Sequence, residues 1–152
     1  MNKVQVLKKL NICYYAIMFA ALAAGTIADL LVVWQKITPI DPLSVWGKVI
    51  QYVVILDVLL TVPGGLWWHK RTCNRLAKIE DESLQLAGYH RSAKWRIILV
   101  SNTMVFAFPA FYLLGAYMSM LWVAAIAAIG WYFTKPTEKK LYFELHPEVE
   151  QY

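Results

Sequence analysis

Charged residues are scarce in this sequence. Only 16% of its 152 residues are Asp, Glu, Lys or Arg, and 59% are hydrophobic. Soluble domains carry about 25% charged residues, and a soluble chain of this length would need that charge to cover its surface. Two cysteines are too few for a disulfide framework, and seven glycines are too few for a collagen-like chain. The remaining class is an integral membrane protein.

The apolar residues fall into runs that are long enough to cross a bilayer. A hydrocarbon core of about 30 Å requires about 20 residues of helix. The predicted spans cover residues 10–34, 46–68, 95–114 and 118–134. The last two spans divide one apolar run at a turn predicted over residues 115–119. We therefore predict an all-α, four-helix membrane bundle that forms one domain over residues 1–152.

The basic residues predict how the bundle is oriented. Of the 15 Lys and Arg residues, 13 lie in the N-terminal segment, around the middle connection (69–94) or in the tail (135–152). The two other connections together contain only Lys36 and Lys48. Short translocated loops lack Lys and Arg, so both termini are predicted to be cytoplasmic in an inner (plasma) membrane protein. The net charge of +5 thus reflects topology and does not indicate a nucleic-acid partner.

A cleaved secretory signal is the main alternative for the N-terminal segment. Lys3, Lys8 and Lys9 precede an apolar stretch, and its Ala21-Leu22-Ala23 resembles a cleavage site. The run continues apolar to Trp34, which is longer than a signal core requires. We therefore expect this segment to be a retained span.

The middle connection and the tail are the main segments outside the predicted spans. Residues 72–87 have a helix-forming composition that ends at Gly88, which predicts an ordered cytoplasmic helix near the anionic leaflet. A solvated helical hairpin is the alternative. Residues 141–145 alternate as a strand would, but an isolated strand of five residues is marginal. Docking of this segment and a frayed tail both remain open.

Asp57 is the most informative single residue of the predicted spans. It lies near the middle of the second span, where a carboxylate costs about 2.5–3.5 kcal/mol on insertion scales. Thr61 shares its helix face, and Pro63-Gly64-Gly65 follows within two turns and favours a kink or a break. A carboxylate beside a hinge is typical of a proton or cation site.

Two further polar residues lie in the predicted spans. Asp29 is near the outer end of the first span, and Asn102 precedes the kink predicted at Pro109 in the third. A polar line from Asp29 through Asp57 to Asn102 would cross the bilayer if these side chains converged. Alternatively, such residues form interhelical hydrogen bonds that contribute about 0.6 kcal/mol each. We favour that interpretation for Asn102.

Catalytic and cofactor motifs are missing from the sequence. It contains no P-loop, dinucleotide-binding glycine motif, Gly-x-Ser-x-Gly or His-Glu-x-x-His. It also lacks paired histidines inside the spans that could bind haem. His69 and Cys73 are spaced to share a metal on one helix face, but two ligands do not complete a zinc site. We therefore predict no metal and no cofactor.

These features predict a non-enzymatic, multi-pass membrane component that acts as a subunit of a larger complex or as a homo-oligomer in the lipid bilayer. The alternative is a small proton- or cation-coupled transporter that uses Asp57. Small residues at helix-packing spacing suit either contacts inside the bundle or self-association. They are Ala21, Gly25, Ala28, Ala124 and Ala128.

Overall fold

The computed structural model describes residues 2–146, and all regular secondary structure in that range is helical. The helices are α1 (Lys3–Val33), α2 (Val45–Leu76), α3 (Glu82–Leu113), α4 (Met118–Phe133) and α5 (Glu138–Leu145). α1, α2 and α3 are each long and apolar enough to cross a membrane. α4 and α5, bent by 76° at their junction, would add a fourth span if they are counted together. The all-α class is confirmed, with three to four helices suited to a membrane.

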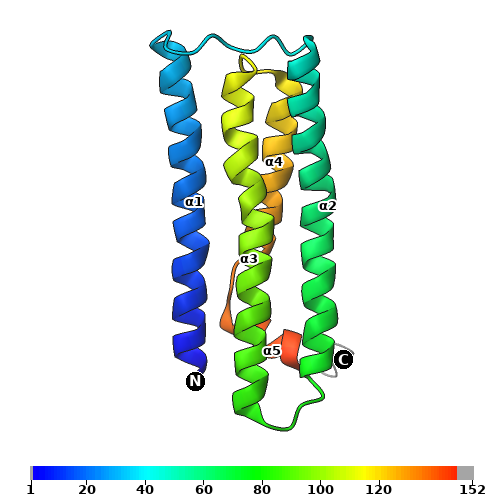
Figure 1. Cartoon of the computed structure of the whole chain (residues 1–152). Helices are drawn as coiled ribbons and strands as arrows, with labels where there is room; N and C mark the ends of the chain where they lie inside the picture. The colour runs from blue at the N-terminus through cyan, green and yellow to red at the C-terminus, as the bar shows by residue number, and fades with distance from the viewer. Residues whose placement is uncertain (1, 147–152) are drawn as a thin grey trace.

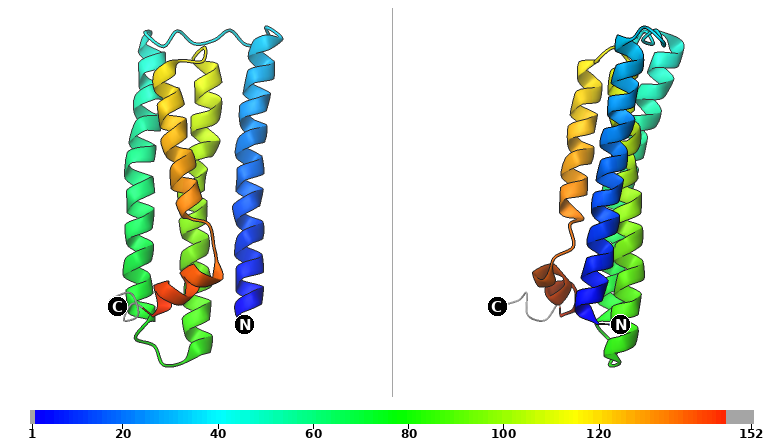
Figure 2. Two further views of the ribbon diagram at one scale, coloured as in Figure 1. Left: turned by 180° about the vertical axis from the view of Figure 1, so that it is seen from behind. Right: turned by 90° about the vertical axis from the view of Figure 1, so that its left-hand side faces the viewer.

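The three long helices lie side by side, with α3 in the middle (Figure 1). α3 packs against α1, α2 and α4, and α4 also contacts α2 (Figure 2). The N-terminus, the α2–α3 connection and α5 lie at one end of the bundle. We call this the basic end, because the Lys and Arg residues of segments 3–9, 70–78 and 135–140 lie there.

Small side chains explain why α1 and α3 pack closely. Ala21 is completely buried and Ala28 is 6% exposed. A Cβ atom at Gly25 would lie 3.2 Å from the Cβ of Phe108 in α3, so a larger residue would separate the helices. The first-span stripe of small residues is therefore used for packing inside the bundle.

Two glycines, one in α2 and one in α4, face the side chain of Val100 in α3. A Cβ atom at Gly65 of α2 would lie 2.9 Å from Cγ2 of Val100. A Cβ at Gly130 of α4 would lie 3.3 Å from Cγ1 of the same valine. Glycine at position 65 thus allows α2 to approach α3 closely, and glycine at position 130, where a Cβ would lie 2.8 Å from Cγ1 of Val62, allows α4 to approach α2 as well as α3.

The helix expected within the middle connection is not a separate element, so that prediction is wrong. α2 continues to Leu76 and α3 begins at Glu82, which leaves only residues 77–81 as a connection. The carboxylate of Asp81 accepts a hydrogen bond from the Ser83 amide and thereby caps α3. Gly88 lies inside α3, where its Cα faces Leu76. The helical hairpin, which was the alternative, describes this segment correctly.

The tail segment 141–145, which alternates as a strand would, is helical and docked on the bundle. Thr137 caps α5 by accepting a hydrogen bond from the amide of Lys140. Leu141 and Leu145 are four residues apart on this helix and are 5% and 4% exposed. They join the apolar cluster formed by α1 and α3 at the basic end. Burial of this helical face therefore decides the conformation; residues 147–152 of the predicted tail lie outside the described range.

The predicted turn between the last two spans is confirmed, whereas the predicted break in the second span is absent. Gly115 and Ala116 have φ angles of 67° and 57°, which reverse the chain between α3 and α4. α2 continues as a helix through Pro63, Gly64 and Gly65, and α3 continues through Pro109.

Candidate functional site

Six polar side chains gather at the basic end, where α5 meets α2 and α3. Five of them come from positions three or four residues apart on the long helices, so they share one face of each helix. These five residues are at most 3% exposed, and the side chain of the sixth, Glu144, is 20% exposed. The six are His69 and Cys73 of α2, Tyr89, Ser92 and Arg96 of α3, and Glu144 of α5. We call them the polar cluster.

Glu144 is the centre of the polar cluster. Its Oε1 accepts a hydrogen bond of 2.8 Å from Nη1 of Arg96, and its Oε2 accepts one of 2.7 Å from the hydroxyl of Tyr89. Oε2 also lies 3.1 Å from Nε2 of His69. Burial alone would raise the pKa of Glu144, but the His69 hydrogen bond and the Arg96 charge outweigh it and lower this pKa to about 2. The carboxylate is therefore ionised at neutral pH.

His69 connects the two long helices to α5. Its Nδ1 lies 2.9 Å from Oγ of Ser92, and its Nε2 lies 3.3 Å from Sγ of Cys73. Burial lowers the pKa of His69, which lies beyond the predicted span, so the ring is neutral at pH 7. A proton on Nε2 is donated to Glu144. A proton on Nδ1 is donated to Ser92, and Nε2 then presents a lone pair to Cys73 and Glu144.

A pocket of about 580 Å³ borders the polar cluster. Arg96 lines it, and the Nε and Nη2 atoms of this buried side chain have no hydrogen-bond partner among the described residues. Lys140 also lines it, and its ammonium group donates a hydrogen bond to the carbonyl of Phe133 at the end of α4. The pocket is therefore rich in positive charge beside the single carboxylate. Its other lining residues are Leu66, His69, Lys70, Cys73, Asn74, Phe133, Thr137, Lys139, Phe143 and Glu144.

The site residues predicted from the sequence lie elsewhere. Asp57 is half-buried on α2, and its Oδ1 accepts a hydrogen bond of 3.1 Å from Thr61. Its Oδ2 is buried without a partner among residues 2–146. Asp29 is half-buried on α1, which lies on the other side of α3 from α2 (Figure 1), and Asn102 is exposed on α3. Within the described chain no hydrogen bond joins these three predicted polar residues.

The polar cluster was largely missed by sequence reasoning. The spacing of His69 and Cys73 was the one signal recognised, but it supplied only two of the six residues. Glu144 joins them from 71 positions beyond Cys73, through a helix that was not predicted. Comparison of the chain with known protein families, characterised proteins and solved structures found no match. The case for a function therefore depends on the chain's own geometry.

Proposed function

We propose that the protein is a non-enzymatic, multi-pass component of the inner membrane that works as a homo-oligomer. The observation that carries this proposal is an unused stripe of small residues on α1. Ala16, Ala20 and Ala23 are exposed and occupy the face of α1 opposite Ala21 and Gly25, which pack against α3. Small residues let membrane helices approach closely enough to associate.

The position of α1 leaves this stripe free for a second copy. α3 is the one helix with which α1 makes extensive contact in the described chain. The outward face is otherwise apolar, and Ile12, Phe19 and Ile27 flank the stripe with 57–66% of their surface exposed. Lipid tails are as apolar as these side chains, so close packing between helices is the interaction that favours association.

The proposed orientation places the basic end in the cytoplasm and uses four spans, with α4 as the short one. The positive charge at the basic end favours this orientation. Trp46 and Trp68 are 74% and 41% exposed on the continuous helix α2. Their separation of 22 residues corresponds to about 33 Å along the helix, which is close to the thickness of a hydrocarbon core of about 30 Å. The spacing therefore suits one tryptophan at each membrane–water interface, where Trp is enriched.

The homo-oligomer can be tested by energy transfer between donor-labelled and acceptor-labelled copies in lipid vesicles. We expect transfer that decreases as lipid is added, because dilution dissociates the copies. The double variant Ala16→Leu/Ala20→Leu should weaken association about tenfold, or about 1.4 kcal/mol, by preventing close approach. The matched control is Ala125→Leu, which changes an exposed alanine of α4 and should leave association unchanged. Equal transfer in all three proteins, or none in the unmodified protein, would refute the proposal.

Proton or cation transport through Asp57 is the second candidate function. The Oδ2 of Asp57, which is buried without a partner among residues 2–146, favours it, because a carboxylate within a span requires a proton, a cation or another partner. In vesicles that contain a pH-sensitive dye, an imposed proton gradient should dissipate faster with the protein, and Asp57→Asn should abolish the difference. Asp29→Asn is the matched control. A flux that persists in Asp57→Asn, or no flux in the unmodified protein, would rule out proton transport by this residue.

A further inference from the structure

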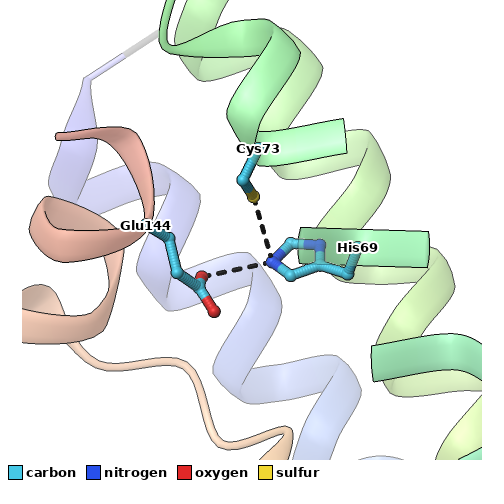
Figure 3. A group of neighbouring side chains, drawn as sticks. All are labelled: His69, Cys73 and Glu144. Carbon is cyan, nitrogen blue, oxygen red and sulfur yellow. Dashed lines mark hydrogen bonds and ion pairs between the residues drawn. The ribbon is translucent and has the colours of Figure 1, made fainter. Parts of the chain in front are cut away.

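Three possible metal ligands converge at the polar cluster. His69 and Cys73 lie one turn apart on α2, and Glu144 approaches them from α5 (Figure 3). One nitrogen of His69, the Sγ of Cys73 and one carboxylate oxygen of Glu144 all lie within 4.8 Å of one another. This arrangement adds a third ligand to the pair that the helix spacing alone brings together.

The spacing of the donor atoms is close to that of a zinc site. With Zn–S of about 2.3 Å and Zn–N or Zn–O of about 2.1 Å, ligand atoms at tetrahedral angles lie about 3.4–3.6 Å apart. The Nε2 of His69 lies 3.3 Å from Sγ of Cys73 and 3.1 Å from Oε2 of Glu144. These two distances are within a few tenths of an ångström of the tetrahedral values. The third pair, Sγ of Cys73 and a carboxylate oxygen of Glu144, lies within 4.8 Å, so binding would draw the thiolate and the carboxylate toward each other.

Hydrogen bonds from neighbouring side chains restrict the orientation of two of these ligands, His69 and Glu144. When Ser92 accepts the Nδ1 proton of His69, the Nε2 lone pair is free to bind a cation. Tyr89 and Arg96 donate to the carboxylate of Glu144 and fix its position. An imidazole, a thiolate and a carboxylate together suit Zn²⁺, whereas Mg²⁺ and Ca²⁺ prefer ligand sets made of oxygen atoms.

We propose that His69, Cys73 and Glu144 form a site for a divalent transition-metal cation of the zinc type. Binding replaces the thiol proton of Cys73 with the cation and releases that proton to solvent. The pocket of about 580 Å³ borders all three ligands, so a fourth coordination position faces the pocket. Three protein ligands and an open position are typical of a site that exchanges water or a solute ligand. The cation also connects α5 to α2.

The proposal can be tested with Co²⁺ as a spectroscopic probe of the purified full-length protein. A Cys13→Ser background leaves Cys73 as the only thiol, and Cys13 lies outside the polar cluster. We expect one Co²⁺ to bind per chain, to give the absorption bands of a tetrahedral thiolate complex, and to be displaced by one equivalent of Zn²⁺. Absence of these bands in the Cys13→Ser protein overturns the proposal without any change to a ligand.

Ligand variants identify the residues that bind the cation. Cys73→Ser should abolish the thiolate-to-cobalt band and weaken binding about 100-fold or more, and Glu144→Gln should weaken binding by a similar factor. Ser92→Ala keeps all three ligands and should weaken binding about tenfold, as removal of an outer partner does. Glu138→Gln changes an exposed carboxylate of the same short helix and should have no effect. Binding that is equally strong in Glu144→Gln and Glu138→Gln overturns the assignment of Glu144.

Discussion

The ion pair between Arg96 and Glu144 allows a quantitative prediction about how α5 is held. The Arg96 side chain is 2% exposed and that of Glu144 is 20% exposed, and their N–O distance is 2.8 Å. The variant Arg96→Met keeps a long side chain but leaves the Glu144 carboxylate without a cationic partner. Breaking a buried ion pair typically costs about 3–5 kcal/mol.

The cost here should be somewhat smaller, because Glu144 keeps two other partners. Tyr89 and His69 still contact its Oε2, and the partial exposure of the side chain admits water. We therefore expect Arg96→Met to lower the stability of docked α5 by about 2–4 kcal/mol. This loss corresponds to an equilibrium constant for the opening of α5 that is about 30- to 700-fold larger. The loss should be local, because α5 follows the four longer helices and its removal leaves them in contact.

Hydrogen exchange of the amides of residues 138–145 is the appropriate measurement, since it reports opening of α5 while the rest of the bundle stays folded. Exchange in Arg96→Met should accelerate by the factor given above, and Lys139→Met, which removes an exposed basic residue of α5, should leave it unchanged. The double variant Arg96→Met/Glu144→Gln should recover part of the protection, because no unpaired charge is left buried. Unchanged exchange in Arg96→Met would refute the reasoning.

Two other features of the bundle can be tested directly. Gly65→Ala should destabilise the bundle by about 1–3 kcal/mol, because the new Cβ would lie 2.9 Å from Cγ2 of Val100. Gly64→Ala places its Cβ in open space and should be neutral or stabilising by up to about 1 kcal/mol. Thermal unfolding in detergent measures both variants, and equal effects would contradict the close packing of Gly65 on Val100. The proposed topology can be tested with the single-cysteine variants Lys78→Cys and Ile37→Cys and a membrane-impermeant thiol reagent. Lys78→Cys should react only from the cytoplasmic side, and Ile37→Cys should react only from the outside. The reverse pattern would show that the orientation is inverted.

The helical class could be predicted from the sequence, because a long apolar run with few charges satisfies its backbone hydrogen bonds in a bilayer by forming a helix. The ends of the long helices could not be predicted in this way. Residues 69–76 and 82–94 are polar, so hydropathy marks them as outside the membrane without showing that α2 and α3 continue through them. Asp81 is a suitable N-cap residue, but Gly88 favours a helix end, so the sequence predicts a separate helix that ends there instead of one that begins at Glu82.

The polar cluster could not be predicted from the sequence for a different reason. Tyr89, Ser92 and Arg96 are spaced three and four residues apart, which is a recognisable helical face once α3 is known to begin at Glu82. Glu144 has no such signal. A short segment such as residues 141–145 fits both strand and helix patterns, and the choice is made by burial of Leu141 against helices that are distant in the sequence. The third ligand of the proposed metal site therefore follows from tertiary packing.

The length of α4 explains why α5 packs where it does. α4 has 16 residues and is about 24 Å long, whereas α1 has 31 residues and is about 46 Å long. At the basic end the long helices extend beyond α4, and apolar side chains such as Leu10 would lose their cover there. α5 supplies that cover with Leu141 and Leu145, and the same docking brings Glu144 to His69. Docking of α5 and binding at the proposed metal site are therefore coupled, because the site requires α5 in this position.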